Sequence, residues 1–340
     1  MKYSILTIYK VKMKNLKFYI FPALFFSFLL LSFKIIFKEK EVPLKNLKDI
    51  VYAKNLDTIG ENDPLNFDLY FPKGATTSKK YPFVMIIHGG GFRNGTKEDF
   101  GKACQHLADS GFIAASINYR MGYTVQEAKG LNRQTSTQSA AAYRAFQDAN
   151  AAMRYLIAKA NEYAIDTGKL FIGGGSAGAM MALNVAYDTE EFYKKNQPEL
   201  VKGLGGLRNS GNELKNTFTI KGICSMWGAL PDSTLITKTN AIPTIFFHGT
   251  EDPAVPIDIG FGIAKGTRFF GTLCLYRQLR KYNQPAIAHI MPGGKHVVKE
   301  YSQQRTFAFP MENTACFFKK VLNKKANSGI YYKMDGSCKL

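Results

Sequence analysis

Short apolar runs alternate with longer amphipathic segments along most of this 340-residue chain. Continuous apolar runs that contain β-branched residues are typical of strands buried on both faces of a parallel sheet. We therefore expect an α/β chain with a mostly parallel, eight-stranded sheet flanked by helices. The expected strands are 49–53, 65–71, 83–87, 113–117, 170–172, 220–225, 244–247 and 286–290.

Three helices are expected between and after these strands, at 139–163, 267–282 and 300–323. In the first, apolar residues recur at helical spacing, and Asp148 lies on another face, either solvated or fixing the helix to a loop. Two polar segments with several glycines, 121–137 and 191–217, interrupt the alternation and read as insertions. Loops on the site edge shape substrate pockets, so we expect both insertions to form pocket walls.

A serine stands at the expected turn from a strand into a helix. Ser176 lies in Gly-Gly-Ser-Ala-Gly at 174–178, directly after the apolar run 170–172 and before the apolar stretch 179–183. Flanking glycines allow the strained backbone and the close packing that a nucleophile elbow requires. The pattern predicts that the hydroxyl of Ser176 is exposed at the tip of the strand.

Three consecutive glycines follow the expected strand 83–87, in His-Gly-Gly-Gly at 88–91. Such a loop can turn its backbone N–H groups toward one point, which suits an oxyanion that forms as a carbonyl becomes tetrahedral. We expect the N–H groups of Gly90, Gly91 and Ala177 to form this oxyanion hole. For the glycine run taken alone, a flexible loop is the alternative.

An acid and a histidine follow the last two strands, in the order serine, acid, histidine. A serine hydroxyl needs a base to accept its proton, and the acid orients that base and stabilises its charged form. We assign Ser176 as nucleophile, His296 as general base and then acid, and Asp252 as the orienting carboxylate. Glu251 remains the alternative acid, because pattern alone does not separate neighbours on a loop.

The four other histidines fit the role of base less well. His106 is expected on a helix surface or partly packed, and His289 falls inside a strand pattern, as a core histidine does. His88 and His248 each close a strand at the site edge, where each either lines the pocket or holds a loop. Only His296 follows the last strand on a glycine-containing loop free to reach the serine. Core packing is expected ahead of pocket lining for four further residues: Met226, Trp227, Phe261 and Phe269.

With these motifs in place, the chain resembles the α/β-hydrolase superfamily, and within it the carboxylesterases with a His-Gly-Gly-Gly loop. The stretches that carry the resemblance are 88–92, 118–122, 147–152, 174–178 and 248–256. They are most similar to bacterial esterases acting on acetylated or feruloylated xylan, and to hormone-sensitive-lipase-like and type B carboxylesterases. Gly175 departs from the pattern, since many relatives carry an acidic residue before the nucleophile. The subfamily and the substrate therefore stay open.

An apolar segment near the N-terminus indicates export. Residues 18–33 are apolar or small, carry no charge and follow four lysines, which is typical of a signal sequence or membrane anchor. The positive flank stays cytoplasmic and sends the following domain across the membrane. We expect residues 1–40 to be this segment, 41–326 the catalytic domain and 327–340 a tail. Cleavage, and a start at Met13 instead of Met1, are left open.

The net charge and the spacing of the cysteines add little to this prediction. The first 40 residues hold eight lysines and one glutamate, so the rest carries about +12 of the net charge of +19. This favours anionic surfaces, including membranes and acidic polysaccharides, but the lysines are too scattered for nucleic-acid binding. The five cysteines lack metal-type spacing, and no metal or organic cofactor is expected. Cys316 and Cys338 are candidates for a disulfide in an oxidising compartment, but buried free thiols are the default expectation for all five.

The sequence therefore predicts an exported serine hydrolase that cleaves carboxylic esters through an acyl-enzyme intermediate. Acetyl or feruloyl esters of polysaccharides and short-chain acyl esters are the expected substrates. One alternative keeps the chemistry and changes the bond, as in a peptidase, amidase or acyltransferase. A second is a non-catalytic binding or adhesion homologue, although such proteins generally lose a triad member and none is lost here. Oligomeric state is not predicted.

Overall fold

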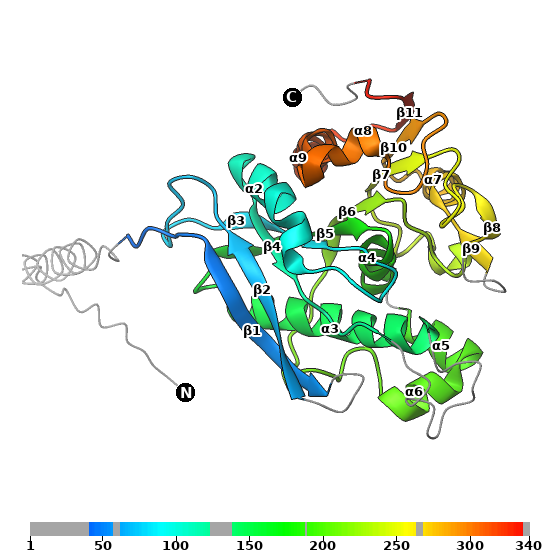
Figure 1. Ribbon diagram of the computed structural model, residues 1–340. Helices are drawn as coiled ribbons and strands as arrows, with labels where there is room; N and C mark the ends of the chain where they lie inside the picture. Colours follow the sequence, from blue (N-terminus) through cyan, green and yellow to red (C-terminus); the bar gives the residue numbers. More distant parts are fainter. Residues whose placement is uncertain (1–40, 57–61, 123–137, 188, 263–267, 336–340) are drawn as a thin grey trace, which may run out of the picture. The chain divides into compact units, whose positions relative to one another are not determined.

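The structure, a computed structural model, describes residues 41–56, 62–122, 138–187, 189–262 and 268–335. Among these residues, nine strands form one central sheet in the order β1-β2-β4-β3-β5-β6-β7-β10-β11 (Figure 1). The strands are β1 (Leu47–Leu56), β2 (Asn62–Tyr70), β3 (Tyr81–Ile87), β4 (Ile113–Ile117), β5 (Ile165–Gly175), β6 (Ile220–Met226), β7 (Thr244–Gly249), β10 (Ala286–Met291) and β11 (Gly329–Tyr332).

The sheet is mostly parallel. Strand β2 pairs antiparallel with both β1 and β4, whereas all pairs from β4 to β11 are parallel. The carboxyl ends of β3, β5, β7 and β10 therefore share one edge, and binding sites of open α/β sheets form at such edges. This arrangement confirms the expected fold class.

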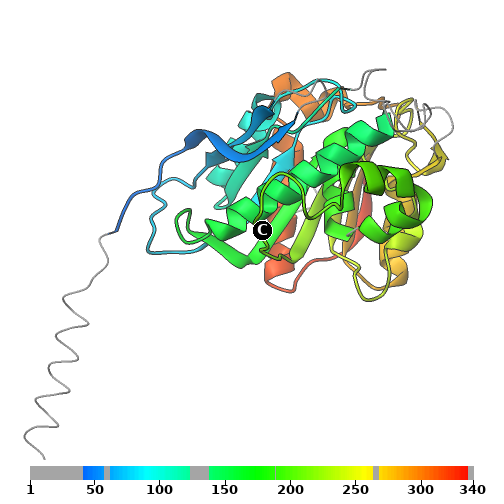
Figure 2. The same ribbon diagram turned by 90° about the horizontal axis from the view of Figure 1, so that it is seen from below.

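Helices cover both faces of the sheet (Figures 1 and 2). One face packs against α2 (Gly101–Asp109) and α9 (Ala308–Leu322), and the other against α3 (Gln138–Ala158), α4 (Ala177–Tyr187) and α7 (Thr272–Lys281). Side chains alternate between the faces of a strand, and those of β3 divide accordingly. Phe83, Met85 and Ile87 join the core under α3 and α4, whereas Val84 and Ile86 join the core under α2 and α9.

The sheet is one strand wider than the sequence predicts. Residues 329–332, within the expected tail, form β11, which pairs with β10 from Ile287↔Gly329 to Ile290↔Tyr332. With only four residues of mixed exposure, this strand leaves no readable pattern in the sequence. Helices α5 (Glu190–Asn196) and α6 (Pro198–Leu204) likewise occupy part of the expected insertion 191–217. Most of the other insertion, 123–137, lies outside the described residues.

Two expected helices start later than predicted. A small antiparallel pair, β8 (Ile259–Phe261) and β9 (Arg268–Phe270), precedes α7, where the helix was expected from 267. The helix expected from 300 is divided into α8 (Lys299–Ser302), a 3₁₀ turn and α9. Pro310 gives the reason, because its ring would clash with the carbonyl of residue 306 in a continuous helix but is tolerated in a first turn. The backbone of Phe307, φ 51°, makes the break.

The described part of the chain contains no helix with the length and apolar character needed to cross a bilayer. The expected N-terminal signal or anchor, 1–40, lies outside the described residues. Of the cysteines, Cys104, Cys224 and Cys274 are free and buried. Cys316 is disulfide-bonded, and the expected partner, Cys338, is outside the described residues.

Candidate active site

Ser176 is the single residue between β5, which ends at Gly175, and α4, which begins at Ala177. Its φ of 54° is in the left-handed region that non-glycine residues rarely adopt. The turn is held by two backbone bonds, since the N–H of Ser176 donates to the Met226 carbonyl at 2.9 Å and its carbonyl accepts from Met180 N–H at 3.0 Å. Strain at one residue is thus maintained by the sheet and the helix around it.

Glycine on both sides of the turn is required by close packing. A Cβ on Gly178 would overlap the carbonyl oxygen of Ile87, and one on Gly174 would lie 2.5 Å from the same oxygen. The turn therefore packs directly on the end of β3, immediately before the His-Gly-Gly-Gly loop. This contact brings the predicted nucleophile and the predicted oxyanion loop together.

The structure brings Ser176, His296 and Asp252 into one hydrogen-bonded chain. Ser176 Oγ lies 2.8 Å from His296 Nε2, and His296 Nδ1 lies 2.8 Å from Asp252 Oδ2. The three side chains come from the turn after β5, the loop after β10 and the loop after β7. Ser176, His296 and Asp252 are therefore in hydrogen-bonding contact with one another.

The carboxylate of Asp252 is fully buried and accepts several hydrogen bonds. Its Oδ1 accepts the N–H groups of Ala254 and Val255 at 2.8 and 3.0 Å, and its Oδ2 contacts His296 and His248. Burial raises the pKa of this carboxyl, but the bonds from His248 and His296 outweigh it and hold the pKa well below its usual range. Asp252 is therefore ionised at neutral pH.

Glu251, the alternative acid, does not join this chain. Its side chain is exposed, and its backbone N–H donates to the carbonyl of Gly294 at 2.9 Å. This backbone bond ties the acid loop to the loop that carries His296. Glu251 thus contributes through its main chain, while its neighbour Asp252 contacts the imidazole.

Ser176 and His296 open into a cavity of about 950 Å³, which Gly90, Gly91 and Ala177 also line. Gly90 and Gly91 have φ of +105° and +62°, a conformation that glycine adopts without strain. The Gly90 carbonyl accepts from the N–H of Arg93 and Asn94, which closes the loop into a turn. The predicted oxyanion donors therefore line the same cavity as Ser176.

The cavity walls only partly follow expectation. Trp227 and Phe269 line the cavity, rather than serving core packing alone, whereas Met226 is fully buried in the core. Phe261 does neither, because 69% of its surface is exposed. From the expected insertion 191–217, two residues reach the cavity: Tyr193 and Gln197.

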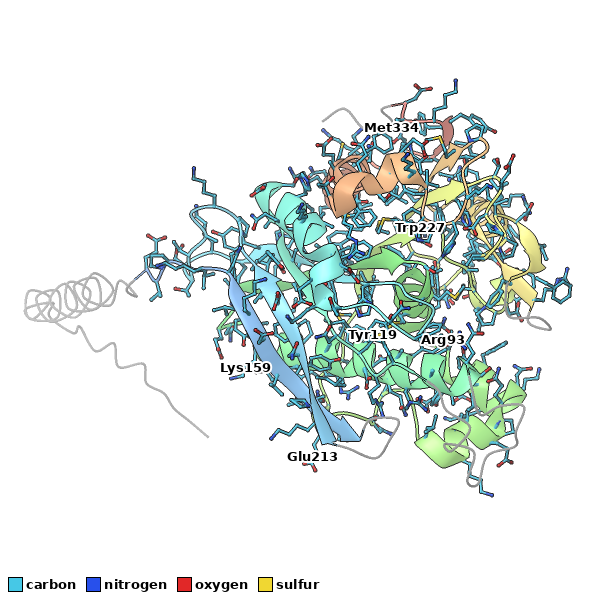
Figure 3. All side chains as sticks on the ribbon, viewed as in Figure 1. Arg93, Tyr119, Lys159, Glu213, Trp227 and Met334 are labelled. Atoms are coloured by element: carbon cyan, nitrogen blue, oxygen red, sulfur yellow. The ribbon has the colours of Figure 1, made fainter. Side chains whose placement is uncertain are left out.

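The ring of Trp227, which Figure 3 labels, packs near Gly175, the residue before Ser176. A Cβ on Gly175 would lie 3.1 Å from Cζ of Phe100 and 3.4 Å from Nε1 of Trp227. Two aromatic rings thus fill the space that a side chain at 175 would take. A side chain at 175 would therefore crowd both rings.

The remaining histidines are buried or peripheral. His106 is half-buried on α2, and His289 is fully buried in β10, stacked on Phe247 at 5.0 Å between ring centroids. Burial lowers the pKa of His289 to about 4, as it does for His88. His248 is the exception, because its Nε2 lies 3.2 Å from Asp252 Oδ2. The sequence placed it at the site edge without indicating that contact.

The sequence did not indicate which side chains support the glycine loop at 88–91. His88 Nδ1 bonds the carbonyl of Gly89 at 2.8 Å, and the hydroxyl of Tyr119 donates to the carbonyls of both residues at 3.0 Å. Arg120, next to Tyr119, donates through its backbone N–H and its side chain to Asp148 on α3. Asp148 therefore fixes α3 to the loop that carries Tyr119, as one of its two expected roles required. Tyr119 and Arg120 lie in the stretch 118–122, which resembles esterases. That resemblance was the sequence signal that could have pointed to this support.

The chain has an α/β-hydrolase fold, and comparisons with known proteins find similarity to esterases. A family model described as BD-FAE matches residues 67–230, which include the serine turn and the glycine loop. Esterase LipI of Mycobacterium tuberculosis is 24% identical over 148 residues, covering 43% of this chain and 42% of LipI. The non-reducing polyketide synthase mapC of Penicillium brevicompactum is 40% identical over 75 residues, 21% of this chain. The match spans 3% of that synthase.

Solved structures share the fold. Esterase 2 of Thermogutta terrifontis in its apo form has a TM-score of 0.57 and 17% identity, covering 83% of this chain and 96% of that one. The same esterase phosphorylated by paraoxon also has a TM-score of 0.57, with 16% identity and the same coverage. These neighbours support the α/β-hydrolase architecture over nearly all of the described domain.

Proposed function

We propose that the protein is a serine carboxylic-ester hydrolase that works through an acyl-enzyme on Ser176. The observation that carries this proposal is the chain of two 2.8 Å hydrogen bonds from Ser176 through His296 to Asp252. It lies at the wall of a cavity of about 950 Å³, large enough for a drug-sized ligand. Acetyl, feruloyl or short-chain acyl esters are the proposed substrates.

In the first half-reaction, Ser176 Oγ attacks the ester carbonyl carbon while its proton passes to His296 Nε2. The carbonyl oxygen becomes an oxyanion, which the N–H groups of Gly90, Gly91 and Ala177 stabilise. The tetrahedral adduct then collapses, the bond to the alcohol oxygen breaks, and His296 donates its proton to the leaving alkoxide. Ser176 is left as an acyl ester.

In the second half-reaction, water takes the place of the alcohol. His296 Nε2 accepts a proton from the water as its oxygen attacks the acyl carbon, and returns it to Ser176 Oγ as that bond breaks. Asp252 keeps Nδ1 protonated throughout and stabilises the transient imidazolium. The products are a carboxylic acid and the regenerated serine.

The test is hydrolysis of p-nitrophenyl and hydroxycinnamoyl esters by the protein without its first 40 residues, with peptide and anilide substrates beside them. We expect ester turnover in the wild type, and a loss of at least about 10³-fold in Ser176→Ala with unchanged thermal unfolding. Full turnover by Ser176→Ala would rule out this mechanism. Turnover of anilides with inert esters would favour the amidase alternative.

We further propose that the chain is exported and acts outside the cytoplasm. The lysine-flanked apolar segment 18–33 supports this, and so does the disulfide-bonded Cys316, since disulfides persist in oxidising compartments. Fractionation of cells expressing the full chain tests it. We expect the protein with the membrane, envelope or medium, whereas deletion of residues 1–40 should leave it in the cytoplasm.

A further inference from the structure

A second histidine reaches the buried carboxylate of Asp252. His248 Nε2 lies 3.2 Å from Asp252 Oδ2 and 3.1 Å from the carbonyl oxygen of Val255. The same Oδ2 is 2.8 Å from Nδ1 of His296. One carboxylate oxygen therefore lies between two imidazoles, and only one of them contacts the serine.

The contacts of His248 define where its proton is. Both neighbours of Nε2 are acceptors, because an ionised carboxylate and a carbonyl have no proton to give. Nε2 must therefore carry hydrogen and donate. Nδ1 lies 2.8 Å from the hydroxyl of Thr272, which can donate to it and so satisfy a neutral imidazole. His248 is thus fixed as a donor toward Asp252.

The two histidines differ in how rigidly they are held. His248 is on β7, between β6 and β10, and its side chain is fully buried, as is that of Thr272 at the start of α7. Asp252 and His296 are on loops, and 23% of the His296 side chain is exposed. The bond from His248 therefore connects the loop carboxylate to the sheet.

We propose that His248 is a positioning residue, which holds Asp252 Oδ2 toward His296 Nδ1 and shares the negative charge of the carboxylate. The proposal rests on the function proposed for Ser176, His296 and Asp252. Without the His248 donor, the carboxylate can rotate away from His296.

Two substitutions separate positioning from packing. In His248→Gln, the side-chain Nε2 is at the same number of bonds from Cα as Nε2 of histidine, so it can still donate to Asp252. In His248→Asn, the amide nitrogen is one bond shorter and corresponds to Nδ1, so it reaches toward Thr272. Both are polar amides at one buried position, which makes each the control for the other.

The main readout is the rate at which a p-nitrophenyl phosphonate modifies Ser176. We expect His248→Asn to react roughly 10- to 100-fold more slowly than wild type, as for a misplaced reacting group. His248→Gln should react at close to the wild-type rate. Equal rates for the two variants would overturn the proposal.

A second readout does not depend on reactivity. The proton between His296 Nδ1 and Asp252 should give a low-field ¹H NMR resonance in the wild type, shifted or lost in His248→Asn and restored in His248→Gln. An identical resonance in both variants would overturn the proposal. If the wild type fails to react with the phosphonate, the proposed function fails, and this resonance alone decides the role of His248.

Discussion

At the Ser176 turn, backbone packs on backbone, whereas around Asp252 the site is held by side chains. Gly174 and Gly178 allow the turn to touch the end of β3, and the strained φ of Ser176 follows from that packing. Asp252 instead depends on imidazole and amide donors that converge on a buried carboxylate. Steric fit thus positions Ser176, and hydrogen bonds position Asp252.

The largest effect is expected where the acid is removed without changing its shape. Asp252→Asn should lower kcat by about 10⁴-fold, because the amide favours the wrong tautomer of His296. Glu251→Gln, one residue away, should leave kcat unchanged, since its side chain is exposed. Steady-state hydrolysis of p-nitrophenyl acetate measures both. Comparable losses in the two variants would contradict the assignment of Asp252.

Disturbing the backbone packing at the Ser176 turn should lower the stability of the protein. Gly178→Ala should lower the free energy of unfolding by about 3 kcal/mol, because its Cβ would overlap the Ile87 carbonyl and backbone must shift. Gly168→Ala on the same strand β5 is the control, with an exposed site and a change within about 0.5 kcal/mol. Urea unfolding compares them. A loss below about 1 kcal/mol for Gly178→Ala would show that the turn tolerates a side chain.

The contrast between steric fit at Ser176 and hydrogen bonds at Asp252 also explains which parts of the site can be predicted from the sequence. Close packing admits only glycine, so the turn at 174–178 and the loop at 88–91 are readable as motifs, and the strand order supplies Asp252 and His296. The bond from His248 to Asp252 is not readable, because it depends on which side chains meet in space. The same holds for Tyr119 beneath the glycine loop and for the short strand β11.

The smallest effect concerns two buried histidines, His289 and His88. His289 and His88 have pKa values lowered to about 4, whereas an unfolded histidine titrates near 6.5. Between these values the unfolded chain binds more protons, so the free energy of unfolding falls as pH falls from 6.5 toward 4. Each histidine contributes up to about 1.4 kcal/mol per pH unit.

Replacing one of these histidines tests the direction of this pH dependence. His289→Phe, which keeps an aromatic ring beside Phe247 and Tyr331, should reduce the acid sensitivity of unfolding by up to about 1.4 kcal/mol per pH unit. Urea unfolding at pH 6.5 and pH 4.5 gives the slopes. Identical slopes for variant and wild type would mean that His289 is protonated alike in both states.

The central claim, covalent catalysis by Ser176, is tested most directly by trapping the intermediate. The wild type is mixed with p-nitrophenyl acetate, quenched in acid within the first turnover, and digested for mass spectrometry. The account predicts one acetyl group on the peptide that contains Ser176, and none in Ser176→Ala. Hydrolysis with an unmodified Ser176, or acetyl on another residue of a working enzyme, would contradict it.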